Sequence, residues 1–243
     1  MPKNVIHDSL YELAPRAMEF NRQHGQWINY YTTWCLLVND YVWNGMMDKG
    51  LAEAQRMHQD AIERHNDFGV SEAYTAMGIA YHFQNNSAES VRCYQLALGY
   101  YPKHADQSVK QNIYSYFCQV LIEMKDNART DSLFTQWRLF LEQQTDGDLE
   151  NEKYAHWMFR FHRERYRYRY ALGQYQEAAQ ELDAMEHYLQ KKDNRSLYEA
   201  QVAGFRTQLA MVRKDYTQAM AYSDVVLDTG YTDGARFVMT LPR

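Results

Sequence analysis

The segment 160–170 carries the residue types most able to recognise a charged group. It holds five arginines interleaved with tyrosines: Arg160, Arg163, Arg165, Arg167 and Arg169. On a helix, residues three and four apart share a face, so one stripe consists of Arg160, Arg163, Arg167 and Tyr170. A row of guanidinium groups favours carboxylates or phosphates, because each charge-assisted hydrogen bond contributes about 1.5 to 3 kcal/mol. The stripe predicts a ligand that is at least partly acidic.

Other interpretations of these arginines remain open. They can stay solvated or pair within the chain, where the candidate partners are Asp146, Asp148, Glu150, Glu152 and Glu181. Interleaved Arg and Tyr could also hold phosphates and stack on bases. The net charge of -5 and the pI near 6.0 give no general attraction to nucleic acid, so we expect no nucleic-acid partner.

Motifs for catalysis, cofactors and structural metals are missing from the sequence. The nine histidines form no HExxH, and GxSxG, GxxxxGK[ST] and GxGxxG are absent. Cys35, Cys93 and Cys118 are odd in number and form no CxxC, so we expect buried free thiols. We predict a chain that is not an enzyme and binds neither metal nor cofactor.

Clusters of apolar residues, most of them led by an aromatic residue, recur at a step of 40 residues. They predict the helices that position the arginines and tyrosines of 160–170. The clusters are Trp34, Leu37 and Tyr41; Tyr74, Met77 and Tyr81; and Tyr114, Phe117 and Leu121. Spacings of three and four residues line one face of a helix. The small residues Gly50, Ser90 and Thr130 are also 40 residues apart. Each would lie on the second helix of a unit, where close packing against the first helix leaves no space for a larger side chain. A period this long predicts stacked helix-turn-helix units.

Only four prolines and eleven glycines interrupt the chain, which favours helices. Because an array of repeats grows without a second core, we predict one all-α domain over 1–243. We expect a capping helix at 8–24, kinked or restarted at Pro15. Helix hairpins should follow at 27–66, 70–101, 105–143, 151–190 and 194–229, with an irregular tail at 231–243. The stretch 144–151 is the clearest loop and the candidate hinge. Because the turn at Gly173 comes late, we expect the preceding helix to be two turns longer.

The second hairpin resembles a tetratricopeptide repeat. The residues that fill the slots of that family in order are Tyr74, Met77, Gly78, Tyr81, Ser90, Tyr94, Ala97 and Pro102. The other four units match more loosely, since Val38, Cys118 and either Tyr166 or Met158 stand where the family has glycine. The resemblance implies a right-handed superhelix of about five repeats whose concave side binds peptides. The step of 40 instead of about 34 residues implies longer helices.

A second resemblance concerns the N-terminal part of the chain. The similarity lies in the segment LYELAPRAMEF at 10–20, followed by Trp34 and by Tyr41-Val42-Trp43. This part is similar to the extracytoplasmic repeat region of Bacteroidetes-type sensor histidine kinases. The kinase half of that family needs a phosphoacceptor His box and glycine-rich nucleotide boxes, which are not present. The resemblance implies an isolated input domain of a two-component system, periplasmic if the chain was trimmed and otherwise cytoplasmic.

The tetratricopeptide resemblance also predicts which residues face a ligand. The positions on the concave side are Cys35 and Asn39, then Thr75, Ile79 and His82, then Asn112, Ser115 and Gln119. When the register is anchored on Gly173 and Tyr175, the arginine stripe joins them, whereas anchoring on Tyr154 and Trp157 rotates it away. The predicted ligand-binding residues are Asn39, Thr75, His82, Asn112, Gln119, Arg160, Arg163, Arg167 and Tyr170. Members of the family that bind chaperone tails use lysines and asparagines at such positions. No lysine stands at these positions in this sequence, so a chaperone tail is disfavoured as the partner.

These expectations define the function class. We predict a non-catalytic domain that binds a peptide, a protein segment or a second copy of the chain, as the sensor-input or scaffold region of a signalling protein. The alternatives are a stand-alone cytoplasmic adaptor and a small-molecule domain with a tyrosine-lined pocket, since the chain has 21 tyrosines. No apolar run reaches the roughly 18 to 20 residues that cross a bilayer, so we expect no membrane span.

Overall fold

The computed structural model describes residues 5–103, 105–191 and 196–228, and these form an all-α fold, as predicted. The contacts group the chain into two compact units, residues 1–124 and 125–243, and each is described by itself. The predicted tail at 231–243 lies outside the described residues. Within the described residues, no helix is both long and apolar enough to cross a membrane.

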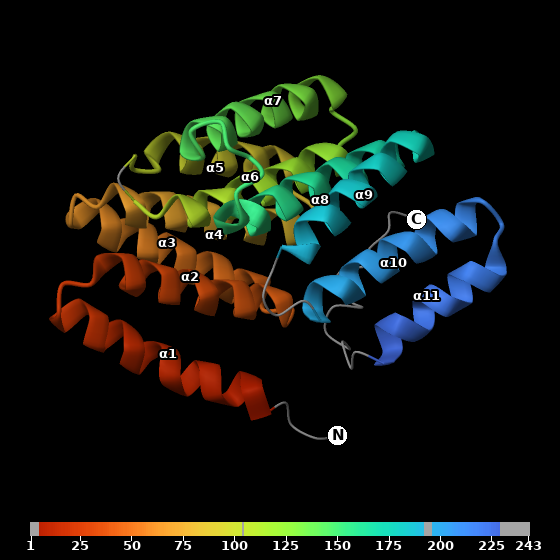
Figure 1. Cartoon of the computed structure of the whole chain (residues 1–243). Helices are drawn as coiled ribbons and strands as arrows, with labels where there is room; N and C mark the ends of the chain where they lie inside the picture. Colours follow the sequence, from red (N-terminus) through yellow and green to blue (C-terminus); the bar gives the residue numbers. More distant parts are fainter. Residues whose placement is uncertain (1–4, 104, 192–195, 229–243) are drawn as a thin grey trace. The chain divides into compact units, whose positions relative to one another are not determined.

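The first unit consists of six helices, which follow one another in Figure 1 from red to yellow-green. Their bounds are α1 Val5–Gln23, α2 Trp27–Trp43, α3 Met47–Glu63, α4 Asp67–Phe83, α5 Ser87–Tyr100 and α6 Gln107–Glu123. Each packs against the next, and α4 also contacts α2 and α6. The helix α1 continues through Pro15 without a restart. The start of α4 at Asp67 is three residues earlier than the expected hairpin boundary.

The second unit holds the remaining helices. Their bounds are α7 Asn127–Gln144, the 3-10 turn η1 Glu152–Tyr154, α8 Ala155–Ala171, α9 Tyr175–Gln190, α10 Ser196–Val212 and α11 Tyr216–Asp228. Neighbouring helices pack in sequence here as well. The third predicted hairpin, 105–143, has its first helix in unit 1 and its second in unit 2.

Three-residue turns join most consecutive helices. In each, the middle residue has a positive φ, which ends the helix in a left-handed conformation. Glycine provides this residue at Gly25, Gly45 and Gly173, whereas His65, Asn85, Lys125 and Lys214 adopt it without glycine. The last group explains why glycine alone does not mark the repeat boundaries in the sequence.

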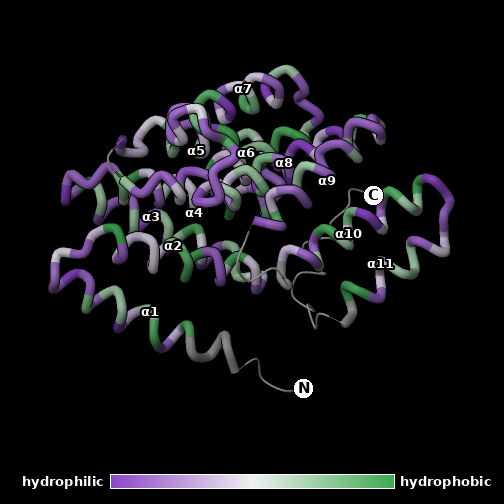
Figure 2. Tube along the Cα trace, in the orientation of Figure 1, coloured by the Kyte–Doolittle hydropathy of each residue, from purple (hydrophilic) through white to green (hydrophobic). Residues whose placement is uncertain are grey.

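Amphipathic helices build the core of each unit, and hydrophobic and hydrophilic stretches alternate along them in Figure 2. The fully buried large side chains of unit 1 are Tyr31, Met57, Tyr94, Ile113 and Leu121. Those of unit 2 are Trp137, Leu141, Met158, Phe159, Phe161, Tyr166 and Met185. Tyr94 and Leu121 belong to the repeat pattern, and four further positions of that pattern, Trp34, Leu37, Tyr114 and Phe117, are also buried, so these repeat residues serve packing.

Small residues permit close helix crossings in unit 1. A Cβ atom on Gly78 would lie 2.8 Å from the ring of Tyr94, and one on Gly50 would lie 2.6 Å from Val42 Cγ2. Ser90, on α5, donates a hydrogen bond of 2.7 Å to the carbonyl of Gly78. The crossings of α2 with α3 and of α4 with α5 therefore depend on the small residues that the 40-residue step singled out.

Candidate ligand-binding face

The first helices of the hairpins in unit 1 are α2, α4 and α6, which begin 40 residues apart. Their equivalent residues form what we call the first-helix face. Its members are Thr32, Cys35 and Asn39 on α2, Glu72, Thr75, Ile79 and His82 on α4, and Asn112, Ser115 and Gln119 on α6. Since α4 contacts both other helices, the face is continuous from α2 to α6. It is mostly polar although many of its side chains are buried.

A buried polar cluster lies on this face between α2 and α4. The carboxyl group of Glu72 is 4 % exposed and accepts a hydrogen bond from the Cys35 thiol. Asn39 Nδ2 donates in turn to Cys35 Sγ over 3.8 Å. Asn39 Oδ1 is buried and has no hydrogen-bond partner among the described residues. The three side chains thus form a chain of contacts that ends in an unsatisfied acceptor.

Burial controls the protonation of this cluster. It raises the pKa of Glu72 to about 7, because a carboxylate loses hydration there, and the hydrogen bond from Cys35 opposes the shift. Burial, followed by the negative charge of Glu72, raises the pKa of the Cys35 thiol well above its usual value. Near neutral pH, Glu72 is therefore divided between its acid and carboxylate forms.

The sequence prediction included Asn39 but omitted Glu72. The available signal was the helical spacing, since Glu72 lies three residues before Thr75 and seven before Ile79, and 40 before Asn112. From sequence alone, a single glutamate among polar residues is expected to be exposed to solvent, because glutamate is rarely buried. Its burial depends on neighbouring helices, which is why the pattern alone did not reveal it.

The other predicted residues of unit 1 lie on α4 and α6. Thr75 is buried and donates its hydroxyl to the carbonyl of Ser71 at 2.9 Å. His82 Nε2 lies 2.6 Å from Glu123 Oε2, which connects α4 with α6. Asn112 and Gln119 are half-buried. Ligand binding by these residues stays a prediction.

A hollow of about 650 Å³ opens at the N-terminal ends of α2 and α4. Its walls come from the connections before α2, α4 and α6 and from the first residues of α2 and α4. The lining residues are Gly25, Gln26, Trp27, Ile28, Asn29, His65, Asn66, Asp67, Phe68, Pro102 and Ala105. The ring of Phe68 meets that of Tyr101 edge-on at 5.8 Å. Phe68 lies one helical turn before Glu72 on α4, so one wall of the hollow is a single turn away from the buried cluster. None of the eleven described residues that line it is a tyrosine.

The register of α8 in unit 2 follows Gly173. Both α2 and α8 have 17 residues and are followed by the same turn, with Gly45 and Gly173 in equivalent places. The helix is therefore not two turns longer, and that expectation is wrong. The extra residues lie instead in the loop before α8, which includes η1.

A polar contact supports this equivalence. Trp34 Nε1 donates to Glu53 Oε2 at 3.2 Å between α2 and α3, and His162 Nδ1 lies 2.6 Å from Glu181 Oε2 between α8 and α9. The two contacts join residues at the same distance from their turn glycines. In this register, Arg163 and Arg167 are equivalent to Cys35 and Asn39.

The arginines of α8 are paired within the chain. Glu164, whose side chain is fully buried, accepts from Arg163 Nη2 at 2.7 Å and from Arg167 Nη1 at 3.0 Å, each on a different carboxylate oxygen. Arg165 pairs with Glu181 at 2.7 Å. These three arginines therefore pair within the chain, as one of the open alternatives expected, although Glu164 was not among the expected partners. Ligand binding by Arg163 and Arg167 stays a prediction.

The remaining predicted residues of α8 are half-buried. Tyr170 stacks on Tyr166 with a ring distance of 5.8 Å and meets Tyr175 edge-on at 5.4 Å. Arg160 is half-buried near the start of the helix. The structure places four predicted residues on α8 and the other five on α2, α4 and α6 of the other unit.

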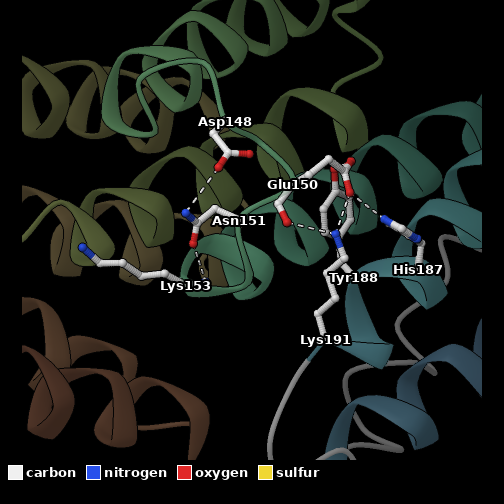
Figure 3. A network of polar contacts seen from close by, with 7 residues as sticks. All are labelled: Asp148, Glu150, Asn151, Lys153, His187, Tyr188 and Lys191. Atoms are coloured by element: carbon white, nitrogen blue, oxygen red, sulfur yellow. Dashed lines mark hydrogen bonds and ion pairs between the residues drawn. The ribbon is translucent and has the colours of Figure 1, made fainter.

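The loop expected to act as a hinge is held to α9 by several bonds (Figure 3). Glu150 lies 2.6 Å from Lys191 Nζ and 2.7 Å from His187 Nε2, and it accepts from the Tyr188 hydroxyl at 2.9 Å. Lys191, followed by His187 and Tyr188, lowers the pKa of Glu150 to about 2. The anchored side is the end of the loop next to η1.

Comparisons with known proteins do not assign a family to the chain. No protein-family model matches it, and curated proteins give no significant match. In the part of the chain that the structure describes, no group of three or more His, Cys, Asp or Glu side chains could hold a metal ion.

Proposed function

We propose that this chain is a non-catalytic binding domain of helix hairpins that takes a peptide or protein segment on the first-helix face of unit 1. The observation that carries the proposal is the buried, polar character of this face, with an unsatisfied acceptor at Asn39 Oδ1. Buried polar groups are normally satisfied, and an orphan acceptor suits a ligand donor. The hollow at the end of α2 and α4 adds an open site of the size that ligands fill.

The properties of Cys35 favour binding over catalysis at this face. A reactive cysteine needs a lowered pKa and access to solvent. Cys35 is 5 % exposed, and its pKa is raised. The thiol therefore acts as a hydrogen-bonding and packing group.

The hairpins resemble tetratricopeptide repeats, and we extend the proposal to a right-handed superhelical array of about five of them. In this proposal the domain is the sensor-input or scaffold region of a signalling protein, and ligand occupancy shifts the packing of successive hairpins. A stand-alone adaptor would use the same face. The coding sequence around this chain would separate the two, since an export signal and a membrane span belong only to the sensor.

A peptide-display selection on the intact chain tests the proposal. Selected peptides should bind Gln119→Arg at least about 10-fold more weakly than the wild-type chain, because a bulky cation would occupy the first-helix face. Gln55→Arg is the matched control, since Gln55 is exposed on α3, away from the first helices. Circular dichroism should show the same helicity in all three chains. Equal binding of the selected peptides by both variants would reject the face.

A further inference from the structure

Glu72 is a buried acidic side chain of unit 1 whose contacts within the described part of the chain supply no positive charge. It is 4 % exposed, and among the described residues no Lys, Arg or His side chain forms an ion pair with it. A buried carboxylate is costly unless it is paired, because an ion loses its hydration. Its only side-chain hydrogen bond within the described residues comes from a thiol, which is a weak donor. The site therefore lacks a positive group.

Asn39 adds a second acceptor to the same cluster. Its Nδ2 group is used on Cys35 Sγ, and Cys35 also bonds Glu72, so the two acceptors lie on either side of one thiol. Asn39 is 5 % exposed, and its Oδ1 atom has no partner among the described residues. A group that satisfies both oxygens must donate hydrogen bonds, and a positive charge on it would stabilise the carboxylate form of Glu72.

We propose that Glu72 and the side-chain oxygen of Asn39 form a subsite for a cationic hydrogen-bond donor, the ammonium or guanidinium group of a lysine or arginine side chain in a bound peptide. This inference rests on the proposed function and names the chemistry of its ligand. Ammonium and guanidinium groups are donors only, and each can bond two acceptors at once. The carboxylate supplies the charge, and the amide oxygen supplies direction.

The hollow beside the cluster suits the approach of such a side chain. Phe68 lines it and lies one turn before Glu72 on α4, and the ring of Phe68 packs edge-on against that of Tyr101. Aromatic faces attract cations and also cover an aliphatic stem. Two rings of this region already carry the chain's own cations, since Arg64 lies 4.8 Å above Trp27 and Lys110 lies 5.7 Å above Tyr101.

The charges of the two units explain why we choose a cation over an anion. In α8, Arg163 and Arg167 share the buried Glu164, so carboxylates of the chain already neutralise part of the arginine stripe. Glu72 has no comparable partner. Cys35 on α2 belongs to the cluster, and the titratable groups coupled to it include Tyr94 on α5 and Tyr101 after α5, with Lys110 of α6 above the Tyr101 ring.

Small amines test the subsite directly on the full chain. The probes are n-butylammonium and n-butylguanidinium, with n-butanol as the uncharged analogue and tetramethylammonium as a cation without N–H donors. Calorimetric titration at pH 7 should show saturable binding of the first two and none of the others. Glu72→Gln should weaken that binding at least about 10-fold, because it removes the charge but keeps the shape.

The matched control is Glu89→Gln, which removes an exposed carboxylate on α5 that pairs with Arg92. It should bind the amines as the wild type does. Equal amine affinity in the wild type and in Glu72→Gln would overturn the inference, and so would the absence of saturable binding in the wild type. Circular dichroism of each variant would confirm that the helices are intact.

Proton release gives a readout that a purely structural role of Glu72 would not produce. A cation bound beside Glu72 stabilises its carboxylate form, so protons leave the protein on binding. The observed binding enthalpy at pH 7 should change between phosphate and HEPES buffers, which differ in ionisation enthalpy and contain no primary ammonium group, for the wild type and not for Glu72→Gln. The same buffer dependence in both proteins would contradict the assignment.

A pair of blocked pentapeptides identifies the source of the cation. Acetyl-Gly-Ala-Lys-Ala-Gly-amide should bind more tightly than n-butylammonium, whereas its norleucine analogue should not bind. If the free amine binds as well as the peptide, the subsite serves a small amine and the peptide assignment is wrong. If display-selected peptides bind normally to Glu72→Gln, the proposed function stands and the inference fails.

Discussion

At the scale of single residues, a buried acid without a cation makes the stability of unit 1 depend on pH. The pKa of Glu72 is about 7 in the folded protein and 4.5 in an ordinary environment. The folded state therefore binds the proton more tightly than the unfolded state does. The contribution of Glu72 to the stability of the folded state is complete below pH 4.5 and is lost as the pH rises through 7.

This linkage predicts the behaviour of Glu72→Gln. The wild-type chain should lose about 3 kcal/mol of unfolding free energy from this group between pH 4.5 and pH 8. The variant should lose much less, because glutamine does not titrate. Urea unfolding at several pH values measures the difference, with Glu89→Gln as the exposed control. A variant with the same pH slope as the wild type would show that Glu72 is not the titrating group.

The arginines of α8 illustrate how a ligand-binding pattern can also be structural. Their pairing with the buried Glu164 means that Arg163→Ala with Arg167→Ala should destabilise unit 2 by about 3 kcal/mol, because a carboxylate would lose two of its cations. Thermal and urea unfolding of the double variant measure this loss. A double variant as stable as the wild type would contradict the structural role.

The control for this prediction is the addition of Glu164→Gln to the double variant. Removal of the buried charge should recover much of the lost stability, since an unpaired carboxylate then no longer exists. If the triple variant is as unstable as the double variant, the loss comes from the packing of the arginine stems instead.

At the scale of the helices, the crossing of α4 with α5 depends on the absence of a side chain at Gly78. A methyl group there would lie 2.8 Å from the buried ring of Tyr94. Gly78→Ala should therefore cost about 1 to 3 kcal/mol through overpacking, despite the better helix propensity of alanine.

Gly99 is the matched control on the other helix of the pair. A methyl group at Gly99 would meet no described atom within 4 Å, so Gly99→Ala should leave stability unchanged or raise it by up to about 1 kcal/mol. Urea unfolding of the two variants side by side checks the prediction. Equal effects of the two changes would show that the crossing has space for a methyl group.

The repeat step explains how far the helices could be predicted. Starts at Trp27, Asp67 and Gln107 follow the 40-residue step, because the turns and apolar positions repeat with it. The step did not give the register of α8. Trp157 and Phe161 lie 40 residues after Phe117 and Leu121 and are buried, but the register of this helix relative to α2 follows the turn at Gly173. A helix with apolar residues on several sides fits more than one register, so sequence spacing alone could not choose between them.

The candidate site was less accessible from the sequence than the helices. Asn39 and Thr75 could be selected because helical spacing depends only on the sequence. The burial of Glu72 and the choice of Glu164 as the partner of the arginines depend on contacts between residues far apart or on side-chain direction. Such information arises only when neighbouring helices pack.

At the scale of the whole molecule, the contacts divide into two compact units, 1–124 and 125–243. In a repeat protein each element gains its stability from its neighbours in sequence, so a local perturbation should spread mainly to adjacent helices. The Gly78→Ala change lies in unit 1, and the paired arginines lie in unit 2. The two sets of variants therefore probe the units separately.

Hydrogen exchange followed by mass spectrometry measures this division. Gly78→Ala should increase the exchange rate of amides in α4 and α5 roughly 10-fold or more, because an opening free energy lower by about 1.4 kcal/mol gives a factor of ten. Exchange in α8 and α9 should stay close to that of the wild type. The double variant of Arg163 and Arg167 should give the opposite pattern, with faster exchange in α8 and α9. If either variant raised exchange equally in both units, the chain would open as one cooperative block, and the division by contacts would not correspond to a division in stability.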